Sequence, residues 1–279
     1  MISGTYFKRH CRYRIGDYVD ARRCQPVFIE DKSIDNNFIF VQTHLLNFFS
    51  QMLGENRSLF PNTYSLVLHN SDLNISKSIV RSIFNNFLDI ENLYTQNLLC
   101  DFMRTYPIPI GFPNPKWSHG NIARIQKVIS QDIEKNNLVY INFNISTNQK
   151  ERQYCLEQIG SRIDIKYPNS AIIEDHDNFV NNTHEKYLQD IKASYFTVSP
   201  DGNGKDCHKT WESIFMRSIP IVTDSYFARK FRRYGLPILV INDWREYSDL
   251  KLSASLYYEL WKDFDPSILN DIGFWFRHD

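Results

Sequence analysis

Residues Ser199 to Glu212 read SPDGNGKDCHKTWE, and the interpretation of the whole chain starts from this stretch. The apolar run from Tyr195 to Ser199 predicts a strand, Gly202 and Gly204 lie in a polar loop, and Cys207 to Arg217 has helical spacing. Glycines admit close backbone approach, and the first N–H groups of a helix point at an anion that binds there. The stretch therefore predicts a phosphate site between a strand and a helix.

Spacing along the predicted helix separates a packing face from a second face. The packing face comprises the positions i, i+4, i+7 and i+8, namely Cys207, Trp211, Ile214 and Phe215. His208 and Glu212 share the other face. We expect Asp206 to cap the helix, His208 to contact phosphate and Glu212 to bind ribose, with a solvated helix position as the alternative for Glu212.

Strands and helices alternate along the chain. Further apolar runs predict strands at 38–41, 64–68, 138–143, 219–222 and 236–241. Helical patterns occur at 44–53, 76–88, 121–135, 150–161 and 185–193, and the proline-rich segment 106–115 is expected to be an ordered loop. This alternation predicts an α/β protein built from parallel sheets.

The predicted strands begin anew near residue 138, which indicates two domains. We expect two Rossmann-like domains whose parallel sheets face a central cleft, formed by residues 1–130 and 131–279. The last helix is expected to be able to pack back on the first domain.

Composition excludes several classes of function. A chain of 279 residues with a 42% apolar fraction is typical of a globular protein. Lys plus Arg and Asp plus Glu number 32 each, so no global charge attracts nucleic acid or an anionic membrane. No signal peptide and no apolar run of membrane-spanning length is visible, and five scattered cysteines indicate a reducing compartment. We therefore expect a cytoplasmic protein.

Four motifs in order along the chain resemble those of exostosin-like glycosyltransferases. They are LVLHNSD at 66–72, IPIGFPNPKWSHGN at 108–121, YINFNISTNQKER at 140–152 and SPDGNGKDCHKTWESIFMRSIPIV from Ser199. The resemblance implies a GT-B fold, inverting stereochemistry and a nucleotide-sugar donor, UDP-linked by family habit, held by the second domain. The first domain would bind the acceptor, a hydroxyl of an oligosaccharide or glycoprotein glycan.

The resemblance weakens at the ends of the chain. Animal and plant members of the family usually carry a membrane anchor, which this sequence does not show. Short unanchored members look most like those of large algal viruses such as chloroviruses, among which is a xylosyltransferase. This narrower resemblance makes xylose the candidate sugar, and the host cytoplasm the expected location of a viral protein.

An inverting transfer needs a base that takes the proton of the acceptor hydroxyl. Asp72 follows a predicted buried strand, at the edge of the sheet where open α/β proteins bind ligands, and matches the family's acidic loop. His69 is the competing base. Capping of a turn by Asp72 and a hydrogen-bonded strand-end position for His69 are the alternatives.

The remaining candidates come from the motifs and are assigned to the donor or to the acceptor. The donor-binding set is Thr147, Asn148, Arg152, Ser199, Gly202, Asn203, Gly204, Lys205, His208 and Glu212. The set at the acceptor or cleft is Trp117, His119 and Asn121. Arg152 would neutralise the diphosphate, but both it and Lys205 are also compatible with solvated surface positions. Asn121 could equally cap a helix, and His119 could pack beneath Trp117.

No cofactor and no metal ion is expected. Asp175-His176-Asp177 resembles a metal-binding D-x-D pattern but follows no convincing strand, and a helix N-terminus with nearby cations stabilises a leaving group without metal. Two other functions remain open: a non-catalytic module that binds sugar or nucleotide, and a nucleotide-sugar epimerase.

Overall fold

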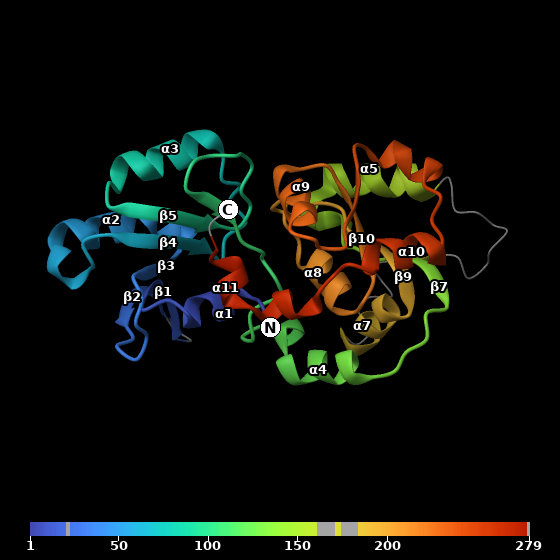
Figure 1. Ribbon diagram of the computed structural model, residues 1–279, viewed down its shortest axis with the longest axis horizontal. Helices are drawn as coiled ribbons and strands as arrows, with labels where there is room; N and C mark the ends of the chain where they lie inside the picture. Colours follow the sequence, from blue (N-terminus) through green and yellow to red (C-terminus); the bar gives the residue numbers. More distant parts are fainter. Residues whose placement is uncertain (21–22, 161–170, 174–183, 278–279) are drawn as a thin grey trace. The chain divides into compact units, whose positions relative to one another are not determined.

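The computed structural model describes residues 1–20, 23–160, 171–173 and 184–277. The chain forms two compact units (Figure 1). Unit 1 comprises Met1–Ile110 and Ser267–Asp279, and unit 2 comprises Gly111–Pro266. Each unit is an α/β structure with its own sheet and its own buried core.

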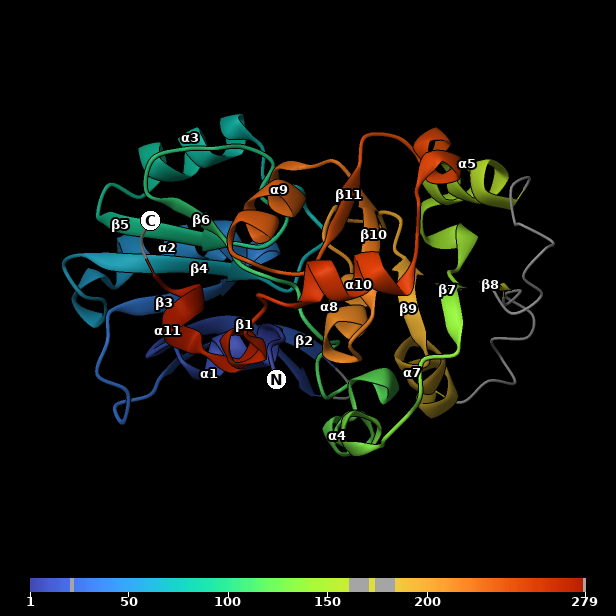
Figure 2. The same cartoon turned by 45° about the vertical axis from the view of Figure 1, so that its right-hand side comes forward.

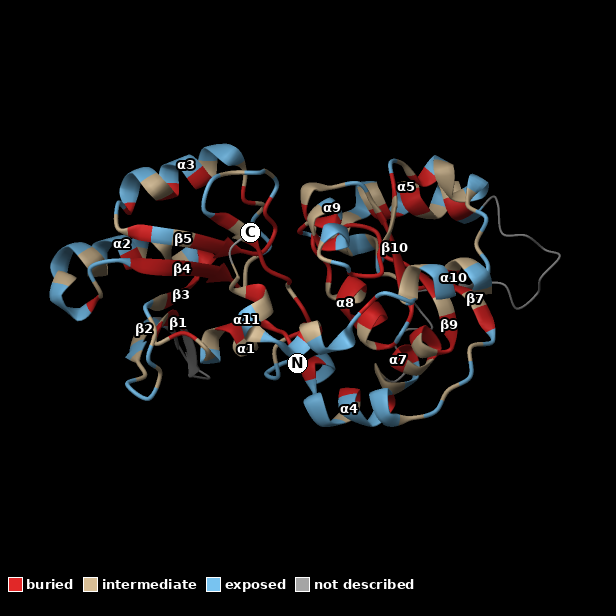
Figure 3. Cartoon of the chain, viewed as in Figure 1, coloured by how far each residue is buried: buried red, intermediate tan, exposed pale blue. Residues whose placement is uncertain are grey.

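Unit 1 is built on a sheet whose described strands have the order β2-β1-β3-β4-β5-β6. Its strands are β1 (Tyr13–Asp20), β2 (Arg23–Glu30), β3 (Phe38–Gln42), β4 (Tyr64–His69), β5 (Ile90–Thr95) and β6 (Thr105–Pro107). β1 and β2 pair antiparallel, and every other neighbouring pair is parallel. The central strand β4 is buried along its whole length (Figure 3), as expected for a parallel strand covered on both faces.

Helices of unit 1 connect these strands or lie at the ends of the unit. They are α1 (Gly4–Arg9), α2 (Leu46–Glu55), α3 (Lys77–Asn86) and α11 (Ile272–Trp275). Ser76 caps α3, where its hydroxyl accepts from the Ile79 N–H. The end of the chain joins the unit through Phe276, whose carbonyl accepts from the Tyr94 hydroxyl at 2.9 Å and whose ring stacks on Phe38.

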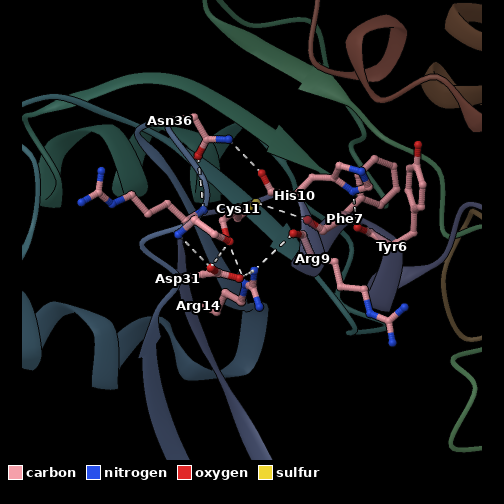
Figure 4. Close-up of polar contacts among 10 residues, drawn as sticks. Tyr6, Phe7, Arg9, His10, Cys11, Arg14, Asp31 and Asn36 are labelled. Carbon is pink, nitrogen blue, oxygen red and sulfur yellow. Dashed lines mark hydrogen bonds and ion pairs between the residues drawn. The ribbon is translucent and has the colours of Figure 1, made fainter.

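A compact polar cluster fixes the start of the chain against the first hairpin (Figure 4). Arg14 donates to the Cys11 carbonyl and forms an ion pair of 2.7 Å with Asp31, just beyond β2. Asn36 donates to the His10 carbonyl at 2.9 Å. These contacts close the loops around β1 and hold α1 in place.

Unit 2 is built on a parallel sheet whose described strands have the order β11-β10-β9-β7-β8 (Figure 2). The strands are β7 (Asn137–Ile141), β8 (Ala171–Ile173), β9 (Ser194–Val198), β10 (Ile219–Thr223) and β11 (Leu239–Ile241). The helices are α4 (Ile122–Ser130), α5 (Gln149–Gly160), α7 (His184–Lys192), α8 (His208–Phe215), α9 (Tyr226–Arg233) and α10 (Ala254–Trp261). Its core gathers Val139, Phe196, Ile221 and Trp244 with their neighbours.

The expected α/β class with largely parallel sheets is confirmed, and several elements differ in detail. The hairpin of β1 and β2 was not predicted, because its sequence lacks a continuous apolar run. The segment expected to be an ordered loop contains the short strand β6. Its proline, Pro107, is the last residue of a strand at the edge of the sheet, where a missing backbone N–H is tolerated. The strand expected at 236–241 is reduced to β11.

The division between the units lies before Gly111, earlier than the expected boundary after residue 130. Helix α4 belongs to unit 2 because it packs on α7 and buries Ile125 and Val128. Lys127 pairs with Glu185 at 2.6 Å, which joins the same two helices. The C-terminal residues from Ser267 belong to unit 1.

Among the described residues, no helix combines the length and the apolar character that crossing a bilayer requires.

Candidate functional site

A cavity of about 510 Å³ lies in unit 2. In the sheet of this unit, β8 and β9 lie on opposite sides of β7, which is the strand order that creates a topological switch point. The cavity is lined by Pro113, Ser118, His119, Arg124, Asn142, Phe143, Asn144, Arg152, His184, Tyr187, His208, Lys209 and Glu212. Residues 142–144 directly follow β7, and the loop from Ser199 that leads to His208 follows β9. The cavity therefore occupies the position where doubly wound sheets bind ligands.

The glycine-containing loop after β9 is held by contacts at both of its ends. The Ser199 hydroxyl is 3.0 Å from the Thr210 hydroxyl of α8. The Gly202 carbonyl accepts from the Asn148 amide at 2.8 Å. A Cβ atom on Gly202 would lie 3.2 Å from Arg152 Nη2 and 3.3 Å from Cys207 Sγ, so a larger residue would crowd the guanidinium. Ser199, Gly202 and Asn148 thus shape the loop and do not line the cavity.

The expected cap of α8 is wrong. Cys207 is the N-cap residue, and its side chain makes no capping hydrogen bond. The buried carboxylate of Asp206 instead accepts from the Trp211 indole at 2.7 Å. The N-cap side chain therefore supplies no acceptor to the start of the helix, where the Thr210 N–H donates to the Cys207 carbonyl at 3.1 Å.

Arg152 is a buried cation at the cavity wall, with 9% of its surface exposed. Its Nε donates to the Asp201 carbonyl at 3.0 Å, and its Nη1 donates to the Asn144 carbonyl at 2.8 Å. Within the described part of the chain no carboxylate lies within ion-pair distance of Arg152. The carboxylate of the neighbouring Asp201 pairs with Lys205 instead. A buried guanidinium without an anion is costly, and such a group at a cavity wall indicates an anionic ligand. Arg152 is therefore not the surface arginine that the sequence left open.

His208, the first residue of α8, is fixed in one orientation. Its Nδ1 lies 2.6 Å from the Gly111 carbonyl oxygen, which only accepts, so Nδ1 carries the proton. Nε2 is then the remaining ring nitrogen of a side chain that lines the cavity. His208 and Arg152 border the same cavity beside the start of the helix.

Glu212 lies one helical turn beyond His208 and is 5% exposed. Its Oε2 accepts from the Tyr187 hydroxyl at 2.7 Å, and Tyr187 in turn accepts from Lys209 Nζ at 2.7 Å. Burial acts to raise the pKa of Glu212. The adjacent His184, the charge of Lys209 and the Tyr187 hydroxyl together outweigh burial and lower the pKa to about 2. Glu212 is therefore a carboxylate at neutral pH and acts only as an acceptor.

Two more histidines border the cavity. His184 Nε2 lies 3.9 Å from Glu212 Oε1, and the His184 ring stacks on Tyr187 with centroids 5.9 Å apart. His119 lies with its ring 6.2 Å from that of His184. Partial burial lowers the pKa of His119, the charge of Glu212 opposes this shift, and the other imidazoles add to it.

The loop that carries His119 depends on Gly120. A Cβ atom there would lie 2.2 Å from the Asn114 carbonyl oxygen, so only glycine fits. Trp117 is 54% exposed and does not line the cavity, whereas His119 lines it and is itself exposed, so His119 is not a core residue. Asn121 caps α4 by accepting from the Arg124 N–H at 3.0 Å, which is the capping alternative left open by the sequence.

The other predicted donor residues lie in the two loops but not at the cavity wall. Asn203 is exposed, Gly204 accepts from the Gly202 N–H, and Lys205 pairs with Asp201. Thr147 lies in the turn after β7, where its N–H approaches the Asn144 carbonyl at 3.4 Å. Of the predicted donor set, Arg152, His208 and Glu212 meet at the cavity.

The two candidate bases belong to unit 1. Asp72 is exposed in the loop beyond the carboxyl end of β4. His69 is 1% exposed, with Nε2 3.0 Å from the Pro109 carbonyl and Nδ1 2.7 Å from the Asn70 N–H. Both ring nitrogens of His69 are therefore engaged inside unit 1.

Sequence reasoning missed several residues of the cavity wall, above all Tyr187, Lys209 and His184. Tyr187 and His184 lie on a helix whose residues are distant in sequence from the glycine loop, and no local motif marks them. Lys209 could have been found from the sequence, because it directly follows the candidate His208 in the first turn of the same helix. The Asp175–Asp177 pattern lies outside the described residues, within which no group of three His, Cys, Asp or Glu side chains forms a metal site.

The shift in the pKa of Glu212 predicts a specific pH dependence of stability. Its folded value of about 2 lies below the ordinary value of 4.5, so ionised Glu212 stabilises the fold above pH 4.5, and this contribution is lost as pH falls towards 2. Urea unfolding between pH 7 and 3 should show a shallower acid decline for Glu212→Gln than for the unsubstituted protein. Exposed Glu134→Gln is the matched control and should follow the unsubstituted curve. Parallel curves for Glu212→Gln would contradict the assignment.

Comparison with known proteins identifies similar folds among solved structures. No family model and no curated protein matches this chain. A solved structure described as the OtsA apo structure matches with a TM-score of 0.51 and 13% identity, over 86% of this chain and 71% of its own. Another, described as trehalose-6-phosphate from E. coli bound with UDP-2-fluoro glucose, matches with a TM-score of 0.50 and 12% identity over the same shares. At such identities the likeness concerns the fold alone, and the chain accordingly has the GT-B fold of two Rossmann-like domains.

Proposed function

We propose that this protein is a glycosyltransferase that moves a sugar from a nucleotide-sugar donor to a hydroxyl of a glycan. One observation carries the proposal: a buried Arg152 without a carboxylate partner lies at a cavity that also contains the ionised Glu212. A nucleoside diphosphate offers an anion for the first and a ribose diol for the second. The GT-B fold supports this assignment by analogy.

The cavity then has two ends. At the phosphate end, Arg152 and the start of α8 offer positive charge and donors, and Nε2 of His208 donates as well when the imidazole is protonated on both nitrogens. At the hydroxyl end, the carboxylate of Glu212 repels phosphate and accepts from a hydroxyl. One helical turn, about 5.4 Å, separates the two along α8, which is a suitable spacing for a phosphate and the ribose next to it.

The mechanism that follows is direct displacement. The acceptor hydroxyl attacks the anomeric carbon, its proton passes to a base, and the bond to the nucleoside diphosphate breaks. Arg152 and the start of α8 stabilise the charge that develops on the leaving group, so a metal ion is not needed. UDP is proposed as the nucleotide because the motif resemblance favours it and because one solved structure of the same fold is bound with UDP-2-fluoro glucose.

Asp72 is the proposed base. It is exposed beyond the carboxyl end of β4, where a parallel sheet presents ligand-binding residues. His69 would first have to break its contacts with Pro109 and Asn70. Exposure and position therefore favour Asp72 over His69.

The finer assignments rest on the four motifs. They support an exostosin-like enzyme of the chlorovirus type in the host cytoplasm, inverting stereochemistry, and xylose as the transferred sugar. Analysis of the anomeric configuration of the product tests the stereochemistry. A binding module would leave the donor intact, and an epimerase would convert the donor without an acceptor, so products formed from donor alone and with acceptor separate the alternatives.

The phosphate end predicts unequal roles for two neighbouring cations. Arg152→Met should weaken UDP binding at least tenfold in calorimetry, because a charge-assisted contact is lost. Lys205→Met is the matched control and should bind UDP with nearly unchanged affinity, since Lys205 pairs with Asp201 away from the cavity. A larger loss for Lys205→Met than for Arg152→Met would show that the phosphate end is misplaced.

Replacing the proposed base should separate chemistry from binding. Asp72→Asn should lower the transfer rate by about 10²–10⁴-fold, the contribution of a positioned base. UDP affinity and melting temperature should stay near those of the unsubstituted protein, because Asp72 is exposed and belongs to unit 1. Normal turnover by Asp72→Asn would remove this residue from the mechanism.

A further inference from the structure

His184 is a polar side chain without an assigned role at the hydroxyl end of the cavity. It is the first residue of α7, and its side chain is 11% exposed. Both ring nitrogens are buried, and neither has a hydrogen-bond partner within the described residues. A buried polar atom without a partner costs about 1–3 kcal/mol, and such atoms are rare enough to require an explanation.

The nearest polar atom to His184 is on Glu212. Nε2 of His184 lies 3.9 Å from Oε1, a separation too long for a direct hydrogen bond. The other carboxylate oxygen, Oε2, already accepts from Tyr187. Oε1 therefore retains its acceptor capacity on the side that faces the imidazole.

No oxygen atom fits on the line between these two atoms, but an oxygen beside that line, about 2.8 Å from each partner, makes a hydrogen bond to both. Glu212 only accepts, so a bridging group must donate to it, and the same group accepts from His184 in the tautomer whose Nε2 carries the proton. A hydroxyl does both, whereas a phosphate oxygen carries no proton and would be repelled by the carboxylate.

We propose that His184 is a specificity residue that, together with Glu212, reads one ribose hydroxyl of the nucleotide. This inference rests on the proposed function, which places the ribose at Glu212. The imidazole lines the cavity and stacks on Tyr187, and the second side-chain torsion of a histidine is soft, so the ring is able to turn towards an incoming hydroxyl. The Nε2 atom of His184 and the unused carboxylate oxygen are then satisfied by the same ligand atom.

The test compares UDP with 2′-deoxy-UDP and 3′-deoxy-UDP by calorimetry. The unsubstituted protein should bind one of the two deoxy analogues at least tenfold more weakly than UDP, because hydrogen bonds to charged groups are strong. His184→Phe preserves the ring that stacks on Tyr187 and removes the N–H group. In this variant the preference for UDP over that analogue should fall to a few-fold, with the affinity for the analogue itself nearly unchanged.

His44→Phe is the control, because it removes an exposed imidazole of unit 1 that does not line the cavity. It should retain the full preference for UDP. Melting temperatures identify any variant that fails to fold, and His184→Asn, which keeps a donor, should then retain part of the preference.

Three results overturn the inference in different ways. An undiminished preference in His184→Phe rejects the role of His184 and leaves the proposed function intact. Equal binding of all three nucleotides by the unsubstituted protein rejects the role of His184 together with the placement of the ribose at Glu212, while binding of UDP itself still supports a nucleotide site. Failure of the unsubstituted protein to bind UDP rejects the proposed function, and the inference falls with it.

Discussion

The buried guanidinium of Arg152 joins the two loops that make the candidate site. From α5 it donates to the carbonyl of Asn144, in the loop after β7, and to the carbonyl of Asp201, in the loop after β9. These strands are neighbours at the switch point of the unit 2 sheet, so their loops diverge and leave a cavity between them. One side chain thereby joins the two loops and supplies the cavity with a positive charge that no carboxylate of the described residues neutralises.

The charge pattern of the cavity follows from the same arrangement. Tyr187 and Lys209 stabilise the ionised Glu212, so a single carboxylate lies among several cationic or imidazole side chains. The proposed nucleotide carries both an anion and a hydroxyl group, and the two features of the cavity that would bind them lie about one helical turn apart.

The sequence predicted those strands and helices that contain a continuous apolar run, a periodic apolar pattern or a motif. The strands β4, β7, β9 and β10 and the helices between them were predicted within a few residues, because their apolar positions repeat with a clear period. The β1–β2 hairpin is held by side-chain contacts such as the Arg14–Asp31 pair, which no period reveals. The domain boundary was misplaced because α4 looks like a connector in sequence and is assigned to unit 2 by packing on α7.

The same distinction holds for the site. His208 and Glu212 were found because one helix spaces them four residues apart, and Arg152 because it follows a strand that carries a motif. Asp206 was misassigned as the helix cap because its true partner, the Trp211 indole, is set by burial of that ring. Tyr187 and His184 come from a different helix, so only the folded chain brings them to Glu212.

Amide hydrogen exchange with and without UDP tests the central claim most directly, because it reports where the nucleotide binds. Saturating UDP should slow exchange in residues 142–152 and 199–212, the two loops that Arg152 joins, and in the start of α7. Protection confined to other parts of the chain, or no protection at saturating UDP, would contradict the account.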